Sequence, residues 1–162
     1  MQAHQSYTEK KYKEAADLFQ SLVKEYQTQG DMLASAEMAN NLSVTLLMLG
    51  KARQAFEAAS HTEDIFKGNN DPSRAAMALG NQAAALEDMK KYEEALGRYQ
   101  ESADLLKNTN EKEIRSLVLK RISALQIRTG RKLDASTSMY AALQDQEKLT
   151  GKEKTLKGLL DT

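Results

Sequence analysis

The sequence predicts an all-α protein built as a stack of antiparallel helix pairs, and three observations support this fold class. The chain of 162 residues contains a single proline and is rich in alanine, leucine, glutamate and lysine, which favour helices. Its apolar residues recur at the spacing of amphipathic helices. When the sequence is laid over itself with an offset of forty residues it falls into register, as the sequences of stacked repeat proteins do.

The clearest column of this forty-residue register contains only alanine, at Ala15, Ala55, Ala95 and Ala135. A methyl side chain lets a neighbouring backbone pack closely, so we expect the two helices of each pair to approach most closely there. Other columns align Tyr12 with Tyr92, Phe19 with Tyr99, Asp31 with Asp71 and Glu111, and Gly50 with Gly130.

Helices are predicted, in order, at residues 6–28, 31–49, 51–67, 71–89, 91–107, 111–129 and 131–148. The first and the fifth carry the plainest apolar stripes. At the boundaries, Gly30 precedes the capping residue Asp31. Gly68 suits a left-handed helix end, after which Asp71 can cap the next helix and Pro72 can occupy its first position.

One repeat domain is expected over residues 1–162. It comprises a partial repeat at 6–28, repeats at 31–67, 71–107 and 111–148, and a short C-terminal helix that acts as a cap at 151–162. Because terminal repeats are often atypical, these ends suit either a complete small protein or a segment of a longer chain.

Composition excludes several classes of protein. The 23 basic and 23 acidic residues balance, so the chain lacks the basic footprint of a nucleic-acid-binding protein. The longest apolar run, residues 42–49, is far shorter than the roughly 18 residues that cross a bilayer, so no membrane insertion is expected. The absence of cysteine fits a cytoplasmic protein.

The sequence also predicts no catalytic or metal-binding site. His4 and His61 are the only histidines, and neither has another histidine or a cysteine near it in the sequence. The glycines mark helix ends and form no phosphate-binding pattern. We therefore expect no catalytic residue, metal or cofactor, and a protein that is not an enzyme.

Residues 91–99 (KYEEALGRY) combine a small residue at the expected helix crossing with an aromatic residue four positions later. With ALGN at 78–81, this segment resembles the forty-residue variety of the tetratricopeptide repeat family. A second copy begins with NNLS at 40–43, and a third with KRIS at 120–123, where Arg121 replaces the asparagine. The resemblance implies a right-handed superhelix whose first helices line a concave groove, as in scaffolds of the partner-of-Inscuteable type and in bacterial proteins of the family.

An advance of about 100° per residue separates a core face from a groove face on the first helix of each repeat. The groove faces collect Glu37, Asn40, Asn41, Val44, Leu47 and Met48, then Met77, Gly80, Asn81, Ala84, Glu87 and Asp88, then Leu117, Lys120, Arg121, Ala124, Ile127 and Arg128. From this set, the predicted partner-binding residues are Asn40, Asn41, Val44, Met48, Met77, Asn81, Ala84, Lys120, Arg121 and Arg128.

Two alternatives stay open on this face. Asn41 and Asn81 each offer a donor and an acceptor to a ligand's backbone, or else they tie neighbouring helices together. Met48 and Met77 either form an adaptable binding surface or fill gaps in the core.

The third groove-lining helix is basic, with Lys120, Arg121, Arg128 and the following Arg131 on one face about 100° wide. Because arginine holds carboxylates bidentately, an acidic peptide or a chain terminus is the preferred ligand. The alternative is a solvated face, or pairing of these cations with Glu87 and Asp88 on the adjacent helix.

Three functions are compatible with this sequence. The first is a protein-interaction scaffold that binds a partner peptide or helix in the groove. The second is an assembly module that associates with copies of itself through end faces that contain Tyr12, Phe19, Leu159 and Leu160. The third is a ligand-sensing regulatory segment of a larger bacterial signalling protein.

Overall fold

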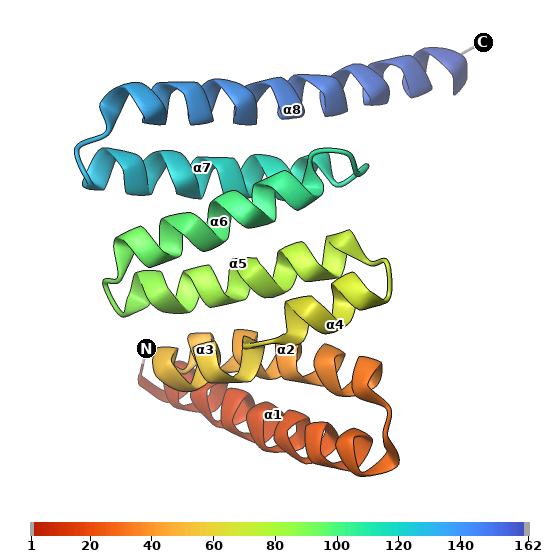
Figure 1. Ribbon diagram of the computed structural model, residues 1–162, viewed down its shortest axis with the longest axis vertical. Coiled ribbons are helices and arrows are strands. Elements are labelled where there is room, and N and C mark those ends of the chain that lie inside the picture. Colours follow the sequence, from red (N-terminus) through yellow and green to blue (C-terminus); the bar gives the residue numbers. More distant parts are fainter. Residues whose placement is uncertain (1, 161–162) are drawn as a thin grey trace.

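A computed structural model describes the backbone of residues 2–160 and the side chains of residues 8–151. Over this range the chain is a stack of helices that runs from α1 at one end to α8 at the other (Figure 1). The helices are α1 (Gln2–Gln29), α2 (Met32–Met48), α3 (Ala52–Ala59), α4 (Thr62–Gly68), α5 (Pro72–Asp88), α6 (Tyr92–Leu106), α7 (Lys112–Arg128) and α8 (Lys132–Leu160). The predicted all-α stack of helix pairs is confirmed.

The alanine column lies where paired helices approach each other. Ala55, Ala95 and Ala135 are buried. Ser43 Oγ on α2 donates directly to the backbone carbonyl of Ala55 on α3, with an O···O distance of 2.7 Å. Two repeats later, Ser123 Oγ on α7 donates to the carbonyl of Ala135 on α8 at 2.9 Å. A side chain larger than a methyl group at this column would separate the helices and break these contacts.

The helix ends follow the capping prediction with one correction. The Asp31 side chain accepts from the N–H of Ala34 at 3.0 Å, and Asp71 accepts from the N–H of Arg74 at 2.9 Å. Gly68, expected in the left-handed conformation, is instead the last residue of α4, and Asn70 adopts that conformation with a φ of 56°. Asparagine tolerates this region of φ better than most residues, and it stands one repeat after Gly30.

The single helix predicted at 51–67 is wrong, because the chain breaks it into α3 and α4. Ser60 is extended and His61 has a φ of 66°, in the left-handed region. Helical periodicity continues on both sides of the break, so the apolar pattern gave no sign of it.

A buried network holds this break. The backbone carbonyl of Ala59, the last residue of α3, accepts hydrogen bonds from Thr62 Oγ1 and from Gln82 Nε2, each at 2.8 Å. Gln82 Nε2 also donates to the buried carboxylate of Glu63 at 2.6 Å. Thr62 Oγ1 lies 3.0 Å from the Asn40 side-chain oxygen, which links α4 to α2. These contacts replace the helical bonds that the break removes.

The outer helices also differ from prediction. Residues 131–148 and the separate cap at 151–162 were expected as two helices, but α8 continues without interruption from Lys132 to Leu160. Gly151 therefore lies inside a helix, and residues 161–162 lie outside the described range. At the other end, α1 begins at Gln2, before the predicted start at residue 6.

Candidate functional site

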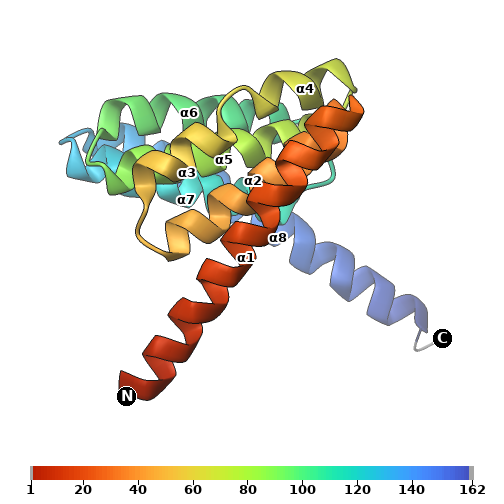
Figure 2. The ribbon, with the colours of Figure 1, turned by 90° about the horizontal axis from the view of Figure 1, so that it is seen from below.

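Two layers are visible when the stack is seen from below. In Figure 2, α4 and α6 lie on one side, and α2 and α7 lie on the other. The free ends of α1 and α8 project beyond α2 and α7, so the exposed side of α2, α5 and α7 lies between two protruding helices. We call this exposed side the inner face.

The inner face carries several exposed apolar side chains. Among residues 8–151, the exposed large apolar side chains of α2, α5 and α7 are Met32, Val44, Met48, Met77, Leu117 and Ile127, and the last five belong to the predicted groove face. Met48 is 59% exposed and Met77 is 49% exposed. The two methionines therefore do not fill gaps in the core, and this alternative is resolved in favour of a surface.

On the α2 part of the inner face, the two neighbouring asparagines differ in burial and in hydrogen bonding. Asn40 is half-buried and contacts Thr62 Oγ1 at 3.0 Å, so it ties α2 to α4. Asn41 is exposed, and within the described part of the chain its side chain makes no hydrogen bond. Val44, one helical turn further on, is 47% exposed. Asn41 and Val44 are thus available to a ligand, whereas Asn40 has a structural role.

On α5, Asn81 occupies the position of Asn41 one repeat later. Its side chain is half-buried and, among the described residues, has no hydrogen-bond partner. Ala84, one helical turn further on, is also half-buried. Neither Asn41 nor Asn81 ties helices together; Asn40 and Gln82, each one position away, do so instead.

Residues of neighbouring helices contact two arginines of α7 and the Arg131 that follows it. Arg121 Nη1 lies 3.8 Å from Glu87 Oε1, with the Arg121 side chain 66% exposed. Arg128 Nη1 donates to Tyr92 Oη at 2.9 Å, and its guanidinium lies 5.1 Å from the centre of that ring. Arg131 forms an ion pair with Glu93 at 2.7 Å. The alternative of pairing with Glu87 is therefore seen for Arg121.

Lys120 differs from the other cations of this face. It is half-buried on α7 and has no hydrogen bond or ion pair among the described side chains. The contact of Arg121 with Glu87 is long and the Arg121 side chain is exposed, so the contact contributes little to stability and can be exchanged for a ligand carboxylate. Lys120 and Arg121 thus remain the cations best placed to receive an acidic group.

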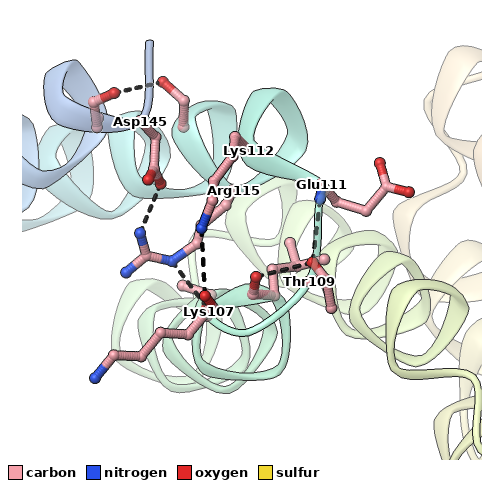
Figure 3. Close-up of polar contacts among 10 residues, drawn as sticks. Lys107, Thr109, Glu111, Lys112, Arg115 and Asp145 are labelled. Carbon is pink, nitrogen blue, oxygen red and sulfur yellow. Dashed lines mark hydrogen bonds and ion pairs between the residues drawn. The ribbon is translucent and has the colours of Figure 1, made fainter. Parts of the chain in front are cut away.

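Arg115, at the start of α7, is not available. Figure 3 shows its guanidinium directed toward Asp145 of α8, where Arg115 Nη1 and Asp145 Oδ2 are 2.6 Å apart. Arg115 Nε also donates to the carbonyl of Ala103 on α6 at 3.3 Å. Because the Asp145 side chain is only 3% exposed, this ion pair fastens α6, α7 and α8 together.

A sizeable hollow of the described structure does not lie on the inner face. It has a volume of about 690 Å³ and lies between α1, α2 and the α3–α4 break, with Ala36, Ala39 and Leu42 among its lining residues. The inner face is hollowed near α8, where a space of about 270 Å³ is lined by Glu113, Leu117 and Gln146, among others. The predicted site is thus an open surface suited to a chain segment, and it has no deep pocket for a small molecule.

Two other findings concern the described residues alone. They contain no group of three or more histidine, cysteine, aspartate or glutamate side chains placed to hold a metal ion. None of their helices has the length and apolar character needed to cross a bilayer.

Sequence reasoning missed the polar network at the helix break. Its members Thr62, Glu63 and Gln82 are buried. Within the three full repeats, Gln82 shares its column with Leu42 and Ile122, and a polar residue between two apolar ones was the available signal.

Comparison with known proteins supports the fold. No protein-family model matches the sequence, and no curated protein matches it. The crystal structure of BtubC (BKLC) from P. vanneervenii is similar, with a TM-score of 0.78 at 16% sequence identity. The match covers 87% of this chain and 59% of BtubC, so this chain spans less than two thirds of that protein. A MamA RS-1 ArsTM double mutant aligns with a TM-score of 0.41 at 12% identity, over 83% of this chain and 96% of MamA.

Proposed function

We propose that this protein is an interaction scaffold of the tetratricopeptide type, which binds an extended or helical segment of a partner protein on the inner face. The observation that supports the proposal best is the pair of asparagines at equivalent positions of two repeats. Asn41 and Asn81 have no side-chain partner in the described structure, and each can donate to and accept from a peptide backbone. We propose no catalytic role.

The surroundings of this pair suit a peptide. Val44, Met48 and Met77 are exposed beside the asparagines, and exposed apolar side chains gathered on one face mark binding sites more often than single ones do. Methionine adapts its shape to different apolar partners. The bound segment would therefore place apolar side chains against α2 and α5 while its backbone meets the two amides.

The basic residues at the α7 end of the inner face favour one orientation of the bound segment. Lys120 and Arg121 lie past Asn81 along the stack, and Arg121 is held only by an exposed contact with Glu87. A carboxylate on the partner would displace Glu87 and bind Arg121 at shorter range. We propose that the ligand is acidic at the end that reaches α7.

Selection from a library of random peptides tests this proposal without a known partner. The expected binders combine apolar residues with a cluster of aspartate or glutamate at one end. Their affinity should fall at least tenfold in the Arg121→Glu, Arg128→Glu variant at low salt, where charges count most. The matched control is Lys24→Glu with Arg53→Glu, which reverses two exposed cations on α1 and α3 and should leave binding unchanged. Equal binding by both variants would refute the acidic-ligand proposal.

A further inference from the structure

The last helix of the stack carries an exposed stripe whose counterpart one repeat earlier is buried. On α6, Tyr99 and Ala103 are each 5% exposed because α7 packs over them. The equivalent residues on α8, Met139 and Leu143, are 37% and 47% exposed. In Figure 1, α8 forms the edge of the stack, and no described helix lies beyond it.

This stripe is continuous along α8. With about 100° per residue, Lys132, Ser136, Met139, Tyr140, Leu143 and Glu147 all lie within about 50° of one line. Tyr140 is 65% exposed, and the neighbouring Ile127 of α7 is 58% exposed. A hollow of about 590 Å³ between α7 and α8 is lined by several of these side chains. The stripe is thus a helix-sized docking face, which we call the α8 face.

The charges of the α8 face are self-complementary. Lys132 and Glu147 lie at equal distances on either side of the midpoint between Met139 and Tyr140. Both are exposed, and neither has an ion pair within the described chain. In an antiparallel pair of α8 helices centred on that midpoint, Lys132 of each copy meets Glu147 of the other. The same arrangement places Met139 against Tyr140 and Ser136 against Leu143.

We propose that the α8 face binds a second copy of this chain to form a two-fold symmetric dimer. Such an interface uses the same patch on both subunits, which the arrangement of opposite charges at its two ends satisfies. A head-to-tail contact with α1 is less favourable, since Leu18 is the only exposed large apolar side chain among the described side chains of α1. Tyr12 and Phe19, expected to form an end face, are half-buried, and Phe19 packs against the core beside Ala16. The side chains of Leu159 and Leu160, expected to contribute to the other end face, lie outside the described residues.

The dimer should be weak. The stripe spans about 22 Å of helix, and a contact between two single helices falls at the small end of specific interfaces, below about 1,200 Å². Dissociation constants in the micromolar range are therefore expected, and dilute samples would be largely monomeric.

Sedimentation equilibrium of the whole chain, from about 1 μM to 1 mM, tests the proposal. Lys132→Glu places like charges at both ends of the interface and should weaken the dimer about tenfold or more. Adding Glu147→Lys restores the complementary pairs and should restore the affinity. Lys148→Glu is the matched control, because this exposed lysine of α8 lies about 130° from the stripe. Circular dichroism verifies that each variant is folded.

The contradicting results are equally specific. A parent protein that stays monomeric at the highest concentration overturns the proposal. So does a dimer that Lys132→Glu leaves unchanged, or one that the double charge exchange fails to restore, because its contact then lies elsewhere. Ile127 borders both surfaces, but the residues changed in the two tests differ, so either proposal can fail without the other.

Discussion

Ser102 Oγ on α6 donates a hydrogen bond to the backbone carbonyl of Ala76 on α5, with an O···O distance of 2.8 Å. One repeat later the donor and acceptor helices are exchanged. Ser116, which is equivalent to Ala76, donates to the carbonyl of Ala142, which is equivalent to Ser102, at 2.9 Å. All four residues are buried. Each crossing thus contains one serine and one alanine, and the conserved quantity is the small combined volume rather than the identity of either residue.

Enlarging one side of this crossing should destabilise the protein. Ser102→Leu is expected to lower the free energy of unfolding by about 1–3 kcal/mol, because the added volume must separate α5 from α6. Ser102→Ala is the control, and the loss of its hydrogen bond should cost about 1 kcal/mol. Urea denaturation measures both. A Ser102→Leu variant as stable as the parent would mean that the helices are not in close contact there.

The break between α3 and α4 depends on Gln82. Gln82→Leu removes the donor to the Ala59 carbonyl and leaves the buried carboxylate of Glu63 without that hydrogen bond. We expect a loss of about 3 kcal/mol, since an unsatisfied buried charged group is costly. Adding Glu63→Leu removes the orphaned carboxylate and should recover part of this loss. Thermal or urea unfolding measures both variants. Equal destabilisation of the single and the double variant would contradict this role of Gln82.

The fold class and the helix pairing were predictable because they depend on periodic features. The alanine column and the caps at Asp31 and Asp71 repeat every forty residues, and a repeated signal is readable in a single sequence. Among the described residues the break at His61 occurs once, and it preserves the apolar register, so periodicity could not reveal it. It depends on Gln82, which is distant in sequence and becomes relevant only when α5 packs against α4.

Lys90 adopts a conformation that suits glycine. Its φ is 61°, and the equivalent residues Gly50 and Gly130 have φ values of 70° and 83°. A side chain in the left-handed region costs about 1 kcal/mol, so Lys90→Gly should raise the free energy of unfolding by that amount. The reverse change, Gly130→Lys, should lower it similarly. Denaturation midpoints that move in the opposite direction would contradict the assigned turn geometry.

Tyr99 should make the protein sensitive to alkali. Burial, followed by the negative charge of Glu87, raises the pKa of Tyr99 well above its ordinary value. A pKa that is higher in the folded state gives a stabilisation that is complete below the unfolded value of about 10 and is lost as the pH rises above it. Tyr99→Phe should therefore reduce the slope of stability against pH above pH 10. An unchanged slope would show that Tyr99 ionises freely in the folded protein.

The candidate site was only partly predictable. The exposed side of α2, α5 and α7 followed from helical geometry, as Val44 shows, but the sequence left open whether Met48 and Met77 fill the core. The polar contacts of the site residues could not be predicted from the sequence. Asn40 contacts Thr62 and Arg121 approaches Glu87 across helices whose relative rotation the sequence leaves open. The distinction between a tied asparagine and a free one therefore required the structure.

The most direct test of the central claim is a map of amide chemical-shift changes when a selected acidic peptide is added to the isotopically labelled protein. We expect the changes to lie along α2, α5 and α7, with the largest near Asn41, Asn81 and Arg121. Alanine at both asparagines should weaken binding at least tenfold without altering the fold. Changes confined to the outer helices α3, α4 and α6, or to the hollow beside α1, would contradict the claim that the inner face is the binding surface.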